Sequence, residues 1–563
     1  MNSSTTPRSE WAILFGLFLA AFAIRLIGIN HGVVLGDERI NEAAKVLTGQ
    51  LVPDQHFYPP LMNYLTAVLY GALYAVGKVT GVWADSAAFR AQYFQDPTIF
   101  VVTGRALVGF IGALMTPISY RIARLLNLTR TEALVVAIFA ALAPISVYLS
   151  YIYKGDVPLA TATLWTVLLL IRKYQTPNLK RVDIALGIAM TLALSFKHSF
   201  IFLMAPLFVA YVAVMLPHLG AKGLLASIGR IFFTGLVLWP ILNIGIVLDF
   251  ETFLAFQKIQ AVMSITEGAT LYDALTLLGQ RMIHWQSGLG FVMPLAFLAF
   301  PLLAPRFNQP LNLIVIWLAV VAGMILVAYL VRLRQPEHLW VSFFVVVQLF
   351  GALALIQLTR FIKPLGVMAT AAALALAQIG SIGVWQETVA RPIAVDIAEH
   401  LKTHFPDRKA VTGIPLPIQQ SRPAQDFEFA RVEATAAKYE VILPERAAER
   451  RVPENNPEAY FILPLPNPMS GLENASDEDL KGNIQAYAWP PQQEDWTLDA
   501  WLAEGVELFV VSNLPYLQRE TSSTMLRAFY QDLGARCAIT AQFAPRKPLF
   551  IERHTVILDC KDA

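Results

Sequence analysis

Long apolar runs recur along most of this chain, and they restrict what it can fold into more than any other feature. Most are long enough to cross the ~30 Å hydrocarbon core of a bilayer as a helix. They lie at about 11–29, 99–117, 132–149, 157–171, 182–196, 199–217, 231–248, 287–304, 311–330, 339–358 and 365–384. Hydrophobic residues make up 56% of the 563 positions and charged residues only 15%, which excludes a single soluble globule. The sequence predicts an α-helical polytopic membrane protein with about eleven spans.

The basic residues between these runs predict the orientation. The run 61–77 is short and rich in Tyr and Gly, and we expect it to lie along the membrane interface. The loops on the side of the N-terminus then carry only basic charges, which is typical of the cytoplasmic face. These charges are Arg121, Arg124, Arg130, Arg172, Lys173, Lys180, Arg181, Lys222, Arg230, Arg306, Arg360 and Lys363. A twelfth span at 61–77 would scatter them over both faces. The first run lacks a convincing cleavage site, so we expect it to be retained.

The composition changes near residue 385, where the long apolar runs stop. Short β-like segments such as "VELFVVSN" then alternate with helix-like ones such as "TMLRAFYQDLG". We expect a membrane domain at 1–384, with a first outer loop at 29–98, and an extracytoplasmic α/β domain at 385–563. Cys537 and Cys560 fall in the second domain. They either form one disulfide or are small buried hydrophobes, and the sequence leaves both readings open.

The ionisable residues that are candidates for chemistry all fall on the predicted outer face, and several of them interrupt otherwise apolar sequence. Any one of these residues alone is typical of a helix end that lies at the membrane interface or forms an ion pair. The occurrence of the whole group on one face indicates a functional cavity. Its members are Asp37, Glu38, Lys154, Asp156, Lys197, His198, Arg332, Arg334, Glu337 and His338. The formal net charge of +2 gives no indication of a nucleic-acid partner.

Two motifs connect this face with a known family. The stretch "GDERINEAAKVLTGQLVPDQHFYPPL" resembles the first outer loop of the polyprenyl-phosphate-sugar-dependent glycosyltransferases of the GT-C fold. This group includes protein O-mannosyltransferases and lipid A aminoarabinose transferases. "SYIYKGDVPL" is similar to the family's Ser/Tyr-rich turn, which ends in an acid, here Asp156. The resemblance implies an inverting transfer in one displacement, with Asp37 as the general base and Glu38 orienting a neighbour or a sugar hydroxyl.

The leaving group of such a reaction is a polyprenyl phosphate, and fixed cations should stabilise its charge. Arg332 and Arg334 are the first candidates, followed by Lys197, His198 and Lys154. Some relatives carry Lys before the double proline, where this chain has Tyr58, and this difference weakens any assignment to the aminoarabinose transferases.

The double proline has a predicted role of its own. Tyr58, Pro59 and Pro60 should turn the chain into a helix at 61–77 that floors a groove for donor and acceptor, with His338 beside it. The implied partners are a lipid-linked sugar, an acceptor of unspecified class and the bilayer. We expect no obligatory metal, although a divalent ion is left open. A lipid-sugar transporter or flippase and a non-catalytic assembly protein on the same fold are the alternatives.

Overall fold

The chain forms two compact units, which consist of Met1–Ile29 with Asp37–Thr388, and of Asn30–Gly36 with Val389–Ala563. The computed structural model describes residues 8–31, 38–54, 56–264, 270–283, 290–331, 336–440, 459–465, 476–481, 496–519, 524–544 and 553–561. Asp37, Arg332 and Arg334 lie outside these residues.

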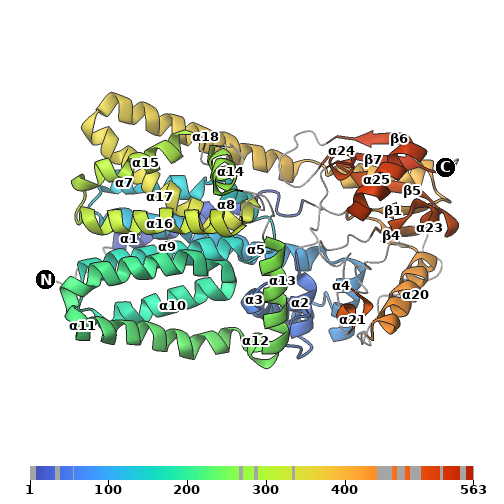
Figure 1. Ribbon diagram of the computed structural model, residues 1–563, viewed down its shortest axis with the longest axis horizontal. Helices are drawn as coiled ribbons and strands as arrows, with labels where there is room; N and C mark the ends of the chain where they lie inside the picture. The colour runs from blue at the N-terminus through green and yellow to red at the C-terminus, as the bar shows by residue number, and fades with distance from the viewer. Residues whose placement is uncertain are drawn as a thin grey trace. The chain divides into compact units, whose positions relative to one another are not determined.

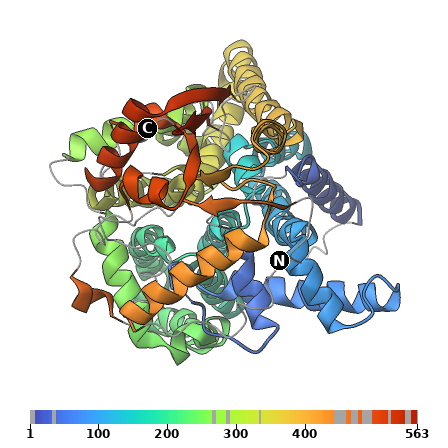
Figure 2. The same ribbon diagram turned by 90° about the vertical axis from the view of Figure 1, so that its right-hand side faces the viewer.

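The first unit is a bundle of long helices that run side by side (Figure 1) and are seen nearly end-on in Figure 2. Each predicted apolar run coincides wholly or largely with helical residues. The helices are α1 (Arg8–Leu26), α5 (Thr98–Ala113), α6 (Met115–Leu125), α7 (Arg130–Ala141), α8 (Pro144–Leu149), α9 (Asp156–Gln175), α10 (Lys180–Phe196), α11 (Ile201–Leu242), α12 (Ile244–Leu248), α15 (Val292–Leu303), α16 (Pro310–Val331), α17 (Glu337–Phe361) and α18 (Lys363–Val389). Among the described residues, 6 helical segments are long and apolar enough to cross a membrane. The predicted fold class is confirmed, while the number of spans stays a prediction.

The segment "AKGLLASIGR" is helical, and our expectation of a loop there is wrong. α11 consists of two helices that meet at Gly220, whose φ of 66° is the left-handed conformation that glycine adopts without strain. Ala, Leu and Lys are strong helix formers, so the second helix begins directly after this glycine. The helix also gives Arg230 a fixed position beside Asp183, with Nη2 and Oδ2 2.7 Å apart.

Helices also occupy the predicted first outer loop and the segment that follows α12. The loop at 29–98 contains α2 (Ile40–Val46), α3 (Leu61–Val79) and α4 (Ser86–Gln95), and the loop after residue 248 contains α13 (Phe250–Ser264) and α14 (Leu271–Ile283). Pro60 is the N-cap of α3, so the double proline ends just where the expected interfacial helix begins. The exposed side of α3 carries Val68, Val76 and Val79, which is typical of a helix in contact with lipid.

Ion pairs join several predicted cytoplasmic loops at one end of the bundle. Arg124 donates from Nε to Glu10 at 3.1 Å, which connects the start of α1 to the end of α6. Arg360 forms a bidentate pair with Glu132. At the start of α10, Asp183 is completely buried and pairs with both Lys173 and Arg230. A buried carboxylate needs such partners, and this one joins α9, α10 and α11.

The second unit is a three-layer α/β domain (Figures 1 and 2). Its main sheet has the order β4-β1-β5-β7-β6, in which β4 (Ile462–Pro464), β1 (Lys409–Thr412) and β5 (Val506–Ser512) are parallel. β7 (Thr555–Asp559) runs antiparallel to β5 and to β6 (Ala538–Phe543). A second small sheet pairs β2 (Gln419–Gln420) with β3 (Ala459–Tyr460). The predicted β-like segment "VELFVVSN" therefore contains a strand, β5.

Helices cover both faces of the main sheet, which explains why its central strands read as continuous apolar runs. Leu508 and Val510 of β5 pack with α19 (Ile393–His404). Phe509 and Val511 point to the other face, toward α23 (Leu498–Ala503) and α25 (Thr524–Arg536). α20 (Arg422–Lys438) lies in a stretch where the sequence has no clear apolar periodicity. The other described helices of this unit are α21 (Asp477–Leu480) and α24 (Leu514–Leu517).

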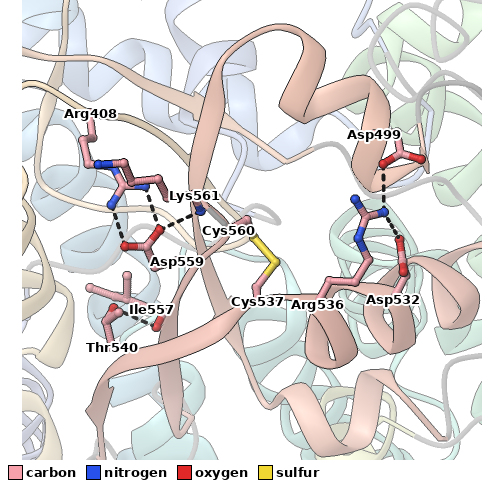
Figure 3. The surroundings of a disulfide bond; sticks show 10 residues. All are labelled: Arg408, Asp499, Asp532, Arg536, Cys537, Thr540, Ile557, Asp559, Cys560 and Lys561. Carbon is pink, nitrogen blue, oxygen red and sulfur yellow. Dashed lines mark hydrogen bonds and ion pairs between the residues drawn. A yellow bond between two sulfur atoms is a disulfide. The ribbon is translucent and has the colours of Figure 1, made fainter. Parts of the chain in front are cut away.

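Cys537 and Cys560 form a disulfide, so the first of the two readings is confirmed. Figure 3 shows the bond between the end of α25 and the residue that follows β7. Beside it, Arg408 donates from Nη1 and Nη2 to the two carboxylate oxygens of Asp559 at 2.6 and 2.7 Å. The end of β7 is thus held by one covalent bond and one bidentate ion pair.

Candidate active site

The two sequence motifs meet at the carboxylate of Glu38. Arg105 of α5 donates to it from Nε at 2.8 Å and from Nη2 at 2.6 Å. The backbone N–H of Tyr153, in the second motif, donates to Oε1 at 2.7 Å. Arg105 also donates to the carbonyl of Ile29 at 3.1 Å. Glu38 is 5% exposed and Arg105 1%, so this buried pair holds the first outer loop against the second motif.

Glycines make this close approach possible. A Cβ atom on Gly104 would lie 2.9 Å from the ring of Tyr153, and one on Gly155 would lie 2.2 Å from the carbonyl oxygen of Phe196. Both distances are too short for a side chain, so the turn of the second motif packs directly against α5 and the end of α10. Glycine at such contacts lets helices in a membrane approach closely.

Asp156 and Lys197 form a second pair in the same region. Asp156 is the first residue of α9, and its Oδ1 accepts a hydrogen bond from Nζ of Lys197, directly after α10. Its Oδ2 is buried and has no hydrogen-bond partner among the described residues. Lys154 and His338 also act on this carboxylate electrostatically. The structure therefore brings three other predicted site residues, Lys154, Lys197 and His338, around the buried acid Asp156.

Lys197 also lies near the ring of Tyr58. The ammonium group is 5.8 Å from the centre of the tyrosine ring, and the guanidinium of Arg39 is at the same distance from that ring. Cations are attracted to the face of an aromatic ring. Two cations from other elements therefore surround the position at which some relatives carry a lysine.

A small pocket lies between the two motifs. It is lined by Arg39, Glu42, Tyr58, Pro59, Met62, Asn63, Tyr153, Lys154, Gly155 and Phe196. Three predicted residues, Tyr58, Pro59 and Lys154, belong to this lining. Arg39 and Glu42 are new to the site. Burial raises the pKa of Glu42 above its ordinary value, although the nearby Lys45 and Arg39 oppose this shift.

His56 and His198 lie beside α13, apart from the pocket lining. Nε2 of His56 is 2.9 Å from Oδ2 of Asp249. The ring of His198 packs edge-on against Phe253, with centroids 5.2 Å apart. The predicted contact of His198 with phosphate stays a prediction. In the described part of the chain, no group of three or more His, Cys, Asp or Glu side chains is arranged to hold a metal ion.

The sequence reasoning missed three charged residues of the site, Arg39, Glu42 and Arg105. Arg105 stands in the middle of a predicted span, where an unpaired guanidinium would be costly, so its position alone indicated an acidic partner. Glu42 is part of "GDERINE", yet no sequence signal distinguished it from a solvent-exposed residue of α2. The predicted base Asp37 and the predicted phosphate ligands Arg332 and Arg334 lie outside the described residues, so their positions are untested.

Comparison with known proteins supports the resemblance found in the sequence. Residues 12–262 match the family model described as dolichyl-phosphate-mannose-protein mannosyltransferase. The match spans less than half of the chain and includes both motifs. The prediction of a membrane glycosyltransferase that uses a lipid-linked sugar is confirmed at the level of this family match. No match to a curated protein was found for the sequence.

Several solved structures are distantly similar. ArnT from Cupriavidus metallidurans bound to undecaprenyl phosphate is 14% identical, with 98% of each chain covered and a TM-score of 0.49. The oligosaccharyltransferase AglB from Archaeoglobus fulgidus, in complex with an inhibitory peptide and a dolichol-phosphate, is 12% identical, covering 93% of this chain and 71% of that chain, with a TM-score of 0.43. The arabinofuranosyltransferase AftD from Mycobacteria is 15% identical, covering 100% and 42%, with a TM-score of 0.40. These similarities are too distant to assign residues.

Proposed function

We propose that this protein transfers a sugar from a polyprenyl-phosphate donor to an acceptor at the outer surface of the plasma (inner) membrane. The observation that carries the proposal is the carboxylate of Glu38, which binds Arg105 and the backbone of Tyr153 and so joins the two motifs. Both motifs lie within the segment that matches the family. The pocket between them combines cations, a carboxyl group and an aromatic ring, as a phosphate-linked sugar requires.

In the proposed reaction, an acceptor hydroxyl oxygen attacks the anomeric carbon while the bond from that carbon to the phosphate oxygen breaks. The electron pair of the broken bond stays on the phosphate, and the hydroxyl proton passes to Asp37. The anomeric configuration inverts in this single displacement. Asp37 directly precedes Glu38 in the chain.

Fixed cations then stabilise the departing phosphate. Lys154 lines the pocket, while Lys197 contacts Asp156 and lies 5.8 Å from the centre of the Tyr58 ring. Because Asp156 and Tyr58 restrain the ammonium group, little reorganisation is needed as negative charge develops. We assign Lys197 the role that a lysine before the double proline has in some relatives, and Arg332 and Arg334 remain proposed ligands of the same phosphate.

The acceptor is a lipid, a glycan or a protein, and its class is left open. A divalent ion is not part of the proposed mechanism, which uses the cations of the chain itself. The basic loops on the side of the N-terminus support placing the pocket and the C-terminal domain outside the cytoplasm.

The test is transfer by the purified full-length protein in lipid nanodiscs. Polyprenyl-phosphate-linked sugars would be supplied one at a time with a membrane extract as the source of acceptor, and products identified by mass spectrometry. Asp37→Asn should lower turnover by about two to four orders of magnitude, the usual scale for a lost general base. Glu251→Gln changes an exposed carboxylate of α13 and is the matched control.

Two results would contradict the proposal. Near-normal turnover in the Asp37→Asn variant would exclude that residue as the base. Movement of the intact lipid-linked sugar across the bilayer without formation of any glycosylated product would indicate a flippase instead.

A further inference from the structure

Glu42 is a carboxyl group in the pocket for which the proposed reaction has no use. It lies in the first turn of α2, and the residue is only 5% exposed. Its neighbours in the pocket lining include Tyr58, Asn63 and Lys154. A buried carboxyl group that lines a cavity is costly unless it binds a partner there.

The protein satisfies this group only in part. Oε2 of Glu42 accepts a hydrogen bond from the backbone N–H of Asp54 at 3.2 Å, and no second hydrogen bond to Glu42 comes from the described residues. Lys45 is the lysine of α2, and it pairs with the side chain of Asp54. Glu38 is different, since Arg105 and Tyr153 occupy both of its oxygens. Glu42 therefore retains hydrogen-bonding capacity that Glu38 has lost.

The composition of the pocket lining indicates which part of the donor would reach Glu42. In a polyprenyl-phosphate-linked sugar, the sugar ring is bonded directly to the phosphate. Lys154 and Arg39 are the cations of the lining and Glu42 is its carboxyl group. If Lys154 and Arg39 bind the phosphate, the sugar ring that is bonded to this phosphate must lie next to them. Glu42 lines the same pocket as these cations, so a hydroxyl of that ring is the group that meets it.

We propose that Glu42 binds a hydroxyl group of the donor sugar and thereby determines which sugar the protein accepts. The inference rests on the proposed function, because it assigns Glu42 to the donor of that reaction. A carboxyl oxygen accepts a hydrogen bond from a hydroxyl group, and a site built for such a bond rejects sugars that lack the hydroxyl. Glu42 is then a specificity-determining residue, separate from the base.

The experiment compares two ligands that differ only in the sugar. Binding of a sugar-bearing polyprenyl phosphate and of bare polyprenyl phosphate would be measured for the wild-type protein, Glu42→Gln and Glu42→Ala in nanodiscs. We expect Glu42→Ala to weaken binding of the sugar-bearing lipid about 10- to 100-fold, the scale of a hydrogen bond to a charged group. Binding of the bare lipid should stay unchanged. Glu42→Gln retains an accepting oxygen and should lose less, and Glu251→Gln should lose nothing.

A series of monodeoxy sugar donors identifies the hydroxyl. On the wild-type protein alone, one of these donors should bind about 10- to 100-fold more weakly than the complete donor, however well the alanine variant folds. One deoxy donor should bind the wild-type protein about as weakly as the complete donor binds Glu42→Ala, and combining the two changes should weaken binding little further. Equal weakening of sugar-bearing and bare lipid in both variants would overturn the inference, as would wild-type affinities in both. Failure of the proposed function looks different: the sugar-bearing lipid would bind, with the loss in Glu42→Ala, but no sugar would be transferred.

Discussion

Replacement of Arg105 by methionine tests how the two motifs are held together. Methionine keeps much of the side-chain length and removes the charge. The variant leaves the carboxylate of Glu38 in a buried site without the two hydrogen bonds, at 2.8 and 2.6 Å, that Arg105 donates. The N–H of Tyr153 still donates to this carboxylate.

The expected magnitude follows from this burial. Removing one partner of a buried ion pair destabilises a protein by about 3–5 kcal/mol, because the other charge remains without compensation. Glu38→Gln alone should have an effect of the same sign, since its amide group would face the guanidinium. The double variant Arg105→Met with Glu38→Gln removes both charges and keeps an acceptor for Tyr153. It should be destabilised by only about 1–2 kcal/mol.

Unfolding in mixed micelles, with an increasing fraction of denaturing detergent, gives the free energies for all four proteins. Transfer activity is measured on the same samples. We expect the Arg105 variant to lose at least about 100-fold in turnover, because a displacement of 1 Å in a site can have that effect. Arg124→Met is the control: its pair with Glu10 is partly exposed, so it should change stability by at most about 1 kcal/mol.

The reasoning is refuted if Arg105→Met unfolds and turns over like the wild-type protein. It is also refuted if the double variant is destabilised by the sum of the two single variants. Additive effects would mean that the two side chains contribute independently and that the bidentate pair does not join the motifs.

Three further predictions concern other parts of the chain. Gly155→Ala should lower turnover about 10- to 100-fold, because the new Cβ would lie 2.2 Å from the backbone oxygen of Phe196; wild-type kinetics would contradict this. Thiol labelling of unfolded, unreduced protein should find no free cysteine, and Cys560→Ser should reduce stability by about 3 kcal/mol on the chain-entropy estimate. Hydrogen bonds from Arg408 hold the pKa of Asp559 below its ordinary value of 3.8, so their contribution to stability is complete above that pH and declines as the pH falls through the lowered value. Hydrogen exchange in β7, corrected for intrinsic rates, should show this loss in the wild-type protein and a smaller one in Arg408→Met.

The sequence predicts the membrane architecture well because length and hydrophobicity determine which segments can cross a bilayer. The run around Arg105 was identified in this way, and the partner of Arg105 could have been sought among the acids of the outer loops. Its identity could not be predicted, because Glu38 and Arg105 are 67 positions apart in the chain. Only the packing of α5 against the first outer loop brings them together.

The site shows a similar limit. The motifs predicted that Asp156 and Lys197 lie on one face, but not that they form a pair. Glu42 became a candidate only when its burial and its neighbours were known. α20 was not predicted, because most of its residues are partly or fully exposed and it shows no regular apolar period.

The strand order of the C-terminal unit has a consequence for how this unit is made. β7 follows all the other strands in the chain, yet it lies between β5 and β6 in the sheet. Until β7 has left the ribosome, neither β5 nor β6 can form its backbone hydrogen bonds with β7. The apolar side chains of both strands also lack their packing against β7. The sheet can therefore close only after synthesis has passed residue 559. Folding of this unit must follow synthesis of the helical bundle, and a nascent chain halted before β7 would present an open sheet edge to chaperones and proteases.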